Sequence, residues 1–384
     1  MAIYTSPLRF ALIFAAVSMN FFFIAATTFA SLGIVLPHMI GEFGWTWAEA
    51  GLGFTLLARA CGLCSPLPAL VIKLIGARGN YGLGAVIMAG GFGFLSMTME
   101  LMSYWAATLL VGVGFAMLAN VPGVAVLSEW TNDKARSVTI GSYLTIGALG
   151  GVAGPFLAIA LLGEEGTWRV FWQFSAVVQL GLGVFAVFAV KQLKGASSSE
   201  ATPSGDSTVP EKSSLQALKE AMVTPQFLVI ILALTVIYFC GLTVNSFLPI
   251  HLMGNGHAEK FAAAALSTFA AANAASRAIG GFVALKIRVR YLLISGLVAE
   301  AAAMTLLGTV NAPWLIIVFA LLQGYAYGMV LFASTMVQIE YFGPEKSAAM
   351  IGFMNMAATT AMIGPVVTGS VGDRFGSFAP VFLV

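Results

Sequence analysis

The chain has 384 residues, of which 59% are hydrophobic and 9% are charged, and its formal net charge is +2. A soluble domain carries about 25% charged residues, so this composition excludes a soluble protein and gives no basic surface for nucleic acid. The three cysteines lie in apolar segments without supporting histidines. They therefore indicate neither a disulfide framework nor a metal site, and we expect an all-α, multi-pass membrane protein without a cofactor.

Apolar runs long enough to cross about 30 Å of hydrocarbon follow one another along the chain. We place them at residues 10–36, 46–71, 79–99, 104–128, 138–162, 168–190, 226–250, 261–284, 291–309, 312–337 and 346–370. A twelfth run begins at Phe378 and is cut off at Val384, so we expect a truncated twelfth helix.

Basic residues between the runs set the orientation. If the N-terminus is cytoplasmic, the outside loops hold only Arg169, Lys260 and Arg374 among the lysines and arginines. This asymmetry is the positive-inside rule. It predicts a plasma (inner) membrane protein with the N-terminus and the central loop in the cytoplasm. Only Arg59 and Arg277 remain inside the membrane.

The central segment 191–225 is polar and rich in Ser, Thr and Pro, so it cannot bury a core. We interpret it as a cytoplasmic linker, with a short amphipathic helix expected at 211–222. The linker separates an N-terminal six-helix bundle, 1–190, from a C-terminal bundle, 226–384.

The two halves resemble each other at a shift of about 210 residues. Tyr81 then meets Tyr291, Gly114 meets Gly324, and the pair Gly154-Pro155 meets Gly364-Pro365. Repeats of this size in a membrane protein predict two pseudo-symmetric bundles with a binding site between them.

With twelve spans, a long central loop and basic short loops after the second and eighth spans, the chain resembles the major facilitator superfamily. The loop signature of that family is partly present in PALVIKLIGARG, where Ile72 takes the acidic place and Lys73, Gly76 and Arg78 remain. The second copy, GGFVALKIRVR, supplies Lys286 and Arg288 and also lacks the acid. The resemblance implies a gating role for these loops, without the charge relay.

Several segments are similar to the monocarboxylate and oxalate:formate transporter branch of that superfamily. They are GEFGWTWAEAG, LSEWTNDKARSVTIG, LPIHLMGNGHAEKFAAAALSTFAAANAASRAIGG and GPVVTGSVGDRFGS. The resemblance implies that the arginine of the eighth span, here Arg277, binds a substrate carboxylate. Asn273 stands where monocarboxylate transporters have an aspartate, so proton coupling through that position does not carry over.

The residues themselves also single out Arg277. A charged side chain inside the hydrocarbon of a bilayer costs about 2.5–3.5 kcal/mol on insertion scales, so it usually faces a protein interior or a wet cavity. The alternative to a functional role is that the Arg277 side chain pairs with a neighbouring helix or extends to the nearer membrane surface. Arg59 is the rival, as a second anion contact or as a partner of Glu300. We expect Glu300 to pack at the bundle edge or near the lipid, and it is our candidate proton carrier.

Other polar side chains within the spans are candidates for a substrate-binding lining, with interhelical hydrogen bonding as the alternative for each. They are Tyr238, Asn245, Asn120, Gln323, Tyr327 and Asn355. Gln323 and Tyr327 are four residues apart and share a helix face. Pro122 in the fourth span frees a backbone carbonyl that a neighbour or water must satisfy.

Small and aromatic residues have structural roles in this interpretation. The glycines of GALGGVAGP, ending at Pro155, predict a close approach of the fifth span to a partner helix. Tryptophans near the predicted span ends indicate interfacial anchors; these are Trp45, Trp47, Trp105, Trp168, Trp172 and Trp314.

The sequence thus predicts a secondary active transporter of a small organic solute, with a carboxylate anion favoured, working as a monomer by alternating access with a proton or counter-anion as coupling partner. A drug or metabolite efflux proton antiporter is the alternative within the superfamily. A membrane sensor or passive channel is the alternative from a different class. Hydrolase, protease and phosphate-loop motifs do not occur, so an enzyme is not expected.

Overall fold

The computed structural model of the chain describes residues 7–131, 133–163, 167–190, 224–342 and 359–383. Every regular element in that part of the chain is a helix. The elements are α1 (Pro7–Thr27), α2 (Phe29–Phe43), α3 (Trp47–Leu63), α4 (Leu67–Ser96), α5 (Leu101–Leu118), α6 (Asn120–Trp130), α7 (Asp133–Leu162), α8 (Trp168–Ala189), α10 (Pro225–Gly254), α11 (Glu259–Val283), α12 (Val289–Thr309), α13 (Pro313–Phe342), the short 3₁₀ helix η2 (Thr359–Ile363), α15 (Gly364–Phe375) and α16 (Ala379–Phe382).

These helices confirm the predicted all-α, multi-pass membrane fold. Within the described residues, 8 helical stretches are long and apolar enough to cross a bilayer. The predicted second span is interrupted, because α3 ends at Leu63 and a turn precedes α4. The predicted eighth span is α11, which carries Glu259, Lys260 and Arg277. The linker with its expected helix at 211–222, and most of the eleventh span, lie outside the described residues.

The breaks in the helices fall where the sequence places proline or glycine. Pro66 caps the start of α4, and Pro68 occupies its first turn, where a missing N–H leaves no helical bond unmade. Gly76, in the predicted loop motif, interrupts α4 with φ 76° and ψ 168°. This backbone conformation is open to glycine and closed to most other residues.

The fourth span breaks at Ala119, between α5 and α6. Side chains of neighbouring helices donate hydrogen bonds to backbone carbonyls at this break. The Tyr143 hydroxyl donates to the Ala119 carbonyl at 2.9 Å, and Asn80 Nδ2 donates to the Met117 carbonyl at 2.8 Å. The break lies three residues before Pro122. Protein donors therefore supply hydrogen bonds that lipid cannot.

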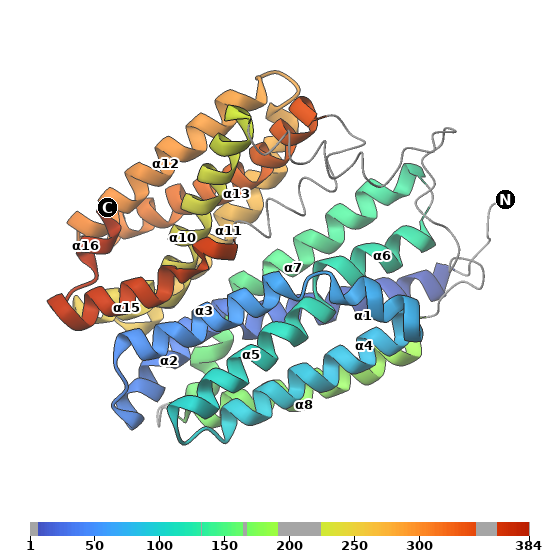
Figure 1. Ribbon diagram of the computed structural model, residues 1–384, viewed down its shortest axis with the longest axis horizontal. Coiled ribbons are helices and arrows are strands. Elements are labelled where there is room, and N and C mark those ends of the chain that lie inside the picture. Colours follow the sequence, from blue (N-terminus) through green and yellow to red (C-terminus); the bar gives the residue numbers. More distant parts are fainter. Residues whose placement is uncertain (1–6, 132, 164–166, 191–223, 343–358, 384) are drawn as a thin grey trace.

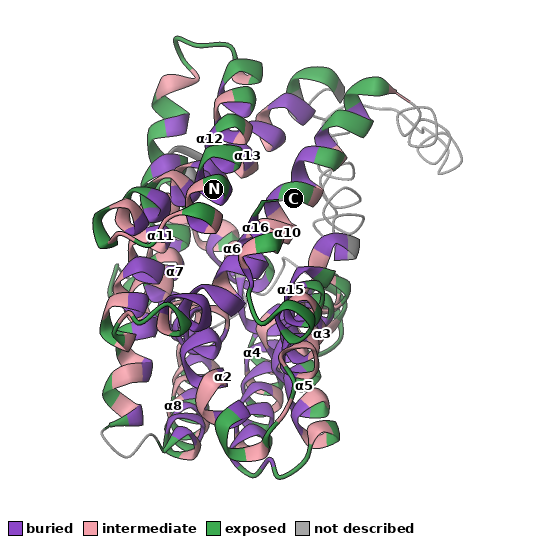
Figure 2. Cartoon of the chain, turned by 90° about the vertical axis from the view of Figure 1, so that its left-hand side faces the viewer, coloured by how far each residue is buried: buried purple, intermediate pink, exposed green. Residues whose placement is uncertain are grey.

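The helices gather in two groups that match the two halves of the sequence. The largest cluster of buried apolar residues is drawn from residues 13–190 together with Ala263, and the other clusters lie within 227–382. Figure 1 shows α10–α13 on one side of the molecule and α1–α8 on the other. The groups meet along two seams, α7 with α11 and α3 with α15, which lie on opposite sides in Figure 2.

The glycines of the two Gly-Pro pairs occupy equivalent places in the halves. A Cβ on Gly154 would lie 2.3 Å from the Ala26 carbonyl oxygen of α1, and a Cβ on Gly364 would lie 2.7 Å from the Phe239 carbonyl oxygen of α10. Each glycine thus lets the fifth helix of its half touch the backbone of the first. The close approach predicted for the fifth span is confirmed, and the packing repeats with the sequence.

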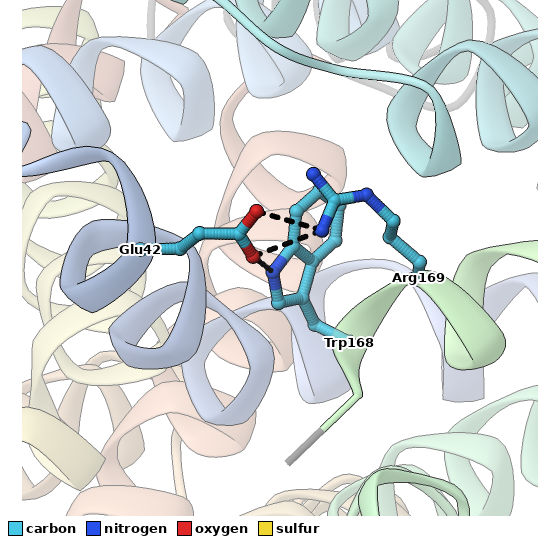
Figure 3. A network of polar contacts seen from close by, with 3 residues as sticks. All are labelled: Glu42, Trp168 and Arg169. Atoms are coloured by element: carbon cyan, nitrogen blue, oxygen red, sulfur yellow. Dashed lines mark hydrogen bonds and ion pairs between the residues drawn. The ribbon is translucent and has the colours of Figure 1, made fainter.

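Two of the tryptophans are not interfacial anchors, so that prediction is wrong for them. Trp168 is 2% exposed and Trp172 is 1% exposed. Figure 3 shows the reason for Trp168, whose indole nitrogen donates to Glu42 Oε2 at 2.7 Å. Arg169 Nη1 lies 2.8 Å from Glu42 Oε1, and its guanidinium carbon lies 4.2 Å from the Trp168 ring centroid. This group ties α2 to α8.

We call the end of the molecule that holds residues 190 and 225 the linker end, and the opposite end the far end. At the far end, the halves are joined by polar contacts. The Asp373 carboxylate of α15 accepts hydrogen bonds from the Trp47 and Ala48 backbone N–H groups at 2.8 and 2.9 Å. It thereby caps the positive end of α3. His38 of α2 also lies 3.2 Å from Glu259 of α11. These contacts hold the two halves together at the far end.

We expect Gly154→Ala to destabilise the protein, because the new methyl group must push α1 away from α7. Overpacking of this kind costs about 1–3 kcal/mol. The measurement is the midpoint of thermal unfolding of the detergent-purified protein. The matched control is Gly90→Ala, since a Cβ at Gly90 meets nothing within 4 Å and the change improves helix propensity by about 1 kcal/mol. Equal midpoints for the two variants would contradict the packing described.

Candidate functional site

The candidate site is built on α11, which lies between α13 of its own half and α7 of the other. Gly328 of α13 allows the first contact, because a Cβ there would lie 2.4 Å from the Asn273 carbonyl oxygen. Ser267 makes the second, donating its hydroxyl to the Val152 carbonyl of α7 at 2.8 Å. Small residues on both partners thus fix α11 at the boundary between the halves.

Arg277 is exposed, and only one nitrogen of its guanidinium group has a hydrogen-bond partner among the described residues. Its Nε donates to Asn273 Oδ1, one turn earlier, at 3.0 Å. Among the described residues, no ion pair involves Arg277, and its two terminal nitrogens have no hydrogen-bond partner. The side chain is therefore not locked against a fixed acid. It lies six residues from the end of α11 at Val283, roughly 9 Å at 1.5 Å per residue.

The two tyrosines predicted for the substrate-binding lining lie near this arginine. Tyr238 of α10 and Tyr327 of α13 are both within range of the Arg277 charge. Their rings are 6.4 Å apart in an edge-to-face arrangement. Gly241 makes room for them, since a Cβ there would lie 2.1 Å from Tyr327 Cε2. The structure thus brings together Arg277, Asn273, Tyr238 and Tyr327 from three helices, and we call these four residues the arginine group.

The opposite half reaches the arginine group through Cys61 of α3, which lies within electrostatic range of Tyr238. The sequence places Cys61 in an apolar segment, and nothing around it indicates a functional role. Arg59 is exposed, and it lies two residues before Cys61, about 200° away around the helix. Among the described residues, no hydrogen bond or ion pair joins Arg59 to the arginine group.

Glu300 is not at the bundle edge, and that expectation is wrong. It is 2% exposed, between α12, α13 and α10, and its Oε1 accepts a hydrogen bond from Gln323 Nε2 at 2.8 Å. The Cys240 thiol lies against the same carboxyl group. A buried carboxyl needs such partners. Gln323 is fully buried, and its hydrogen bond joins α13 to α12. This is the interhelical hydrogen bonding that we gave as the alternative to a substrate-binding role.

Asn245 is the one remaining predicted lining residue whose side chain the structure describes. Asn245 is half-buried and donates to the Gly241 carbonyl within its own helix at 2.8 Å. The side chain of Asn120 and all of Asn355 lie outside the described residues.

The predicted loop motifs lie at the linker end. Arg78 Nε donates to the Val190 carbonyl, at the residue that follows α8, so it serves an end carbonyl that the helix leaves unpaired. Lys73, Lys286 and Arg288 are exposed. Among the described residues, no three His, Cys, Asp or Glu side chains come together as a metal site requires.

Comparison with known structures supports this fold. A bacterial homologue of the human lysosomal transporter Spinster, in an inward-facing and unoccupied conformation, has a TM-score of 0.79 and 18% identity, covering 97% of this chain and 84% of that one. The nucleoside transporter NupG has a TM-score of 0.74 and 14% identity, covering 98% of this chain and 95% of that one. Identities this low show a common fold.

Sequence comparison finds both a relative and a family. An uncharacterized protein of Campylobacter jejuni is 25% identical over 164 residues, which is 43% of this chain and 50% of that protein. The match thus spans half the length of this relative. The model of the Major Facilitator Superfamily matches residues 18–364. The protein is a multi-pass membrane protein, and it belongs to the Major Facilitator Superfamily.

Proposed function

We propose that this protein carries a small organic anion, a carboxylate, by alternating access. The observation that carries the proposal is Arg277. Its terminal nitrogens are unpaired among the described residues, and it lies beside the boundary of the two halves, where a superfamily of this design places its substrate.

A guanidinium suits this task for two physical reasons. It stays protonated at any relevant pH, and its planar fork of donors matches a carboxylate in bidentate fashion. Its charge is also costly to hold away from water, and an arriving anion offsets part of that cost. Binding therefore favours a state in which the site closes around the pair.

The neighbours of Arg277 give the site its shape. Asn273 accepts the Nε hydrogen, so the donors left for a substrate are those of the two terminal nitrogens. Tyr238 and Tyr327 place aromatic rings beside them. We infer that the substrate carboxylate meets Arg277 and that its organic part lies against the two rings.

The contacts between the halves support a state open at the linker end. The contacts of Asp373 and His38 with the other half both lie at the far end, while Arg277, nearer the linker end, is exposed. From the basic loops, we propose that the linker end is cytoplasmic in a plasma (inner) membrane. Opening the far end would then require Asp373 to leave α3 and His38 to leave Glu259.

Proton coupling is a second proposal, and the buried Glu300 favours it. Glu300 is 2% exposed, and its hydrogen-bond donor is a neutral glutamine. Because no cation pairs with it among the described residues, burial makes its charged form costly, and binding a proton relieves that cost. Proton binding by Glu300 would also suit an efflux proton antiporter. Glu300 is therefore our candidate for binding the coupling ion, and Arg277 is our candidate for binding the substrate.

We expect Arg277→Ala to abolish uptake of short carboxylates into proteoliposomes and Arg277→Lys to leave only a fraction of it. Hydrogen bonds to a charged group are worth about 1.5–3 kcal/mol, which is roughly 10-fold or more in affinity. A lysine keeps the charge but not the bidentate fork.

The control for this experiment is Arg9→Ala, which removes an exposed arginine from the first turn of α1. It should leave uptake unchanged. Undiminished carboxylate uptake by correctly inserted Arg277→Ala protein would refute the proposed role.

For the coupling proposal, we expect Glu300→Gln to keep exchange of substrate across the membrane but to lose accumulation driven by a pH gradient. The amide oxygen of the new glutamine can still accept from Gln323, so the fold is preserved, but the side chain no longer carries a proton. Counterflow and gradient-driven uptake are measured on the same proteoliposomes. Accumulation that still follows the pH gradient in this variant excludes Glu300 as the proton carrier.

A further inference from the structure

A cavity of about 300 Å³ opens at the linker end of the C-terminal half, and no member of the arginine group lines it. Three helices form it: α10, α12 and α13. It is lined by Pro225, Gln226, Val229, Ile230, Arg290, Leu293, Ile294, Val337 and Tyr341.

The polar part of the cavity carries an unpaired positive charge. Arg290 lies at the start of α12, with its guanidinium carbon 5.1 Å from the Tyr291 ring centroid. No ion pair joins it to an acid among the described residues. Lys286 and Arg288 are exposed in the loop just before it. An anion is the ligand that this local charge favours.

The rest of the cavity wall is aliphatic and open to the outside of the bundle. Val229 is 57% exposed and Ile294 is 54% exposed. One turn further into the membrane, exposed Leu232 and Val298 continue the same two helices. Because α10 and α12 both run from the linker end to the far end, an apolar lane extends from the cavity toward the membrane centre.

We propose that this cavity binds an anionic phospholipid of the leaflet at the linker end. The phosphate group lies against Arg290, where Gln226 and Tyr341 can donate hydrogen bonds, and an acyl chain follows the lane along α10 and α12. A free phosphate ion would use only the first part of this surface. The combination of a cation at the helix ends with an apolar lane matches a lipid, as basic pockets between membrane helices do.

The test is thermal unfolding of the full-length protein in detergent, with phosphatidylglycerol or phosphatidylcholine added at equal mole fraction. A ligand of the native state raises the midpoint by mass action. We expect phosphatidylglycerol to raise it more than phosphatidylcholine does. In Arg290→Ala, the apparent affinity for phosphatidylglycerol should fall on the order of fivefold or more.

The matched control is Arg288→Ala, which removes the same charge from the same loop but does not line the cavity. It should keep the preference for phosphatidylglycerol. Equal losses in the two variants would mean general attraction to an anionic surface and would overturn the proposal.

Two further arms separate the remaining outcomes. Inorganic phosphate at the same concentration should not reproduce the midpoint rise; if it does, the site takes a free anion and the lipid proposal fails. If Arg290→Ala does not fold, Val229→Trp tests the apolar wall instead. That variant should lose the phosphatidylglycerol effect by filling the cavity, and a retained effect would overturn the proposal.

Discussion

The structure depends on the cost of keeping one guanidinium close to the hydrocarbon of a membrane. A bilayer offers Arg277 neither counter-charge nor hydrogen-bond acceptor, so the protein must supply them or admit water. It supplies one acceptor, the Asn273 amide, and leaves the terminal nitrogens unpaired among the described residues. The charge is thus partly satisfied, and an anion would complete it. This incomplete satisfaction distinguishes Arg277 from Arg169, whose carboxylate partner is fixed.

The packing around Arg277 follows from small residues placed where helices must touch. Gly324 and Gly328 let α13 approach the backbone of α11, and Gly154 and Gly364 do the same for the first helix of each half. Without a hydrophobic driving force between helices in lipid, such close backbone contacts supply much of the association. Contacts at the far end, above all the Asp373 carboxylate on the first turn of α3, then hold the two halves together at that end.

Much of the fold could be predicted from the sequence, because hydrophobic length and the distribution of charge act locally. Most run boundaries and the Gly-Pro packing follow from local spacing, although α4 begins at Leu67, twelve residues before the predicted third span. Partners from distant helices do not follow from spacing. The hydrogen bond between Gln323 and Glu300, the burial of Trp168 against Glu42 and the proximity of Cys61 to Tyr238 each join residues whose positions only tertiary packing sets. The break after α3 was missed because the prolines lie inside an otherwise apolar run.

Ligand-induced stabilisation of the purified protein tests the anion-binding claim most directly. The midpoint of thermal unfolding is measured against a series of short mono- and dicarboxylates and their neutral amide analogues, for the native protein and for Arg277→Ala. The account predicts that at least one carboxylate raises the midpoint of the native protein, that its amide does not, and that Arg277→Ala abolishes the effect. An equal rise in Arg277→Ala, or an equal rise with the amide, would contradict an anion site built on this arginine.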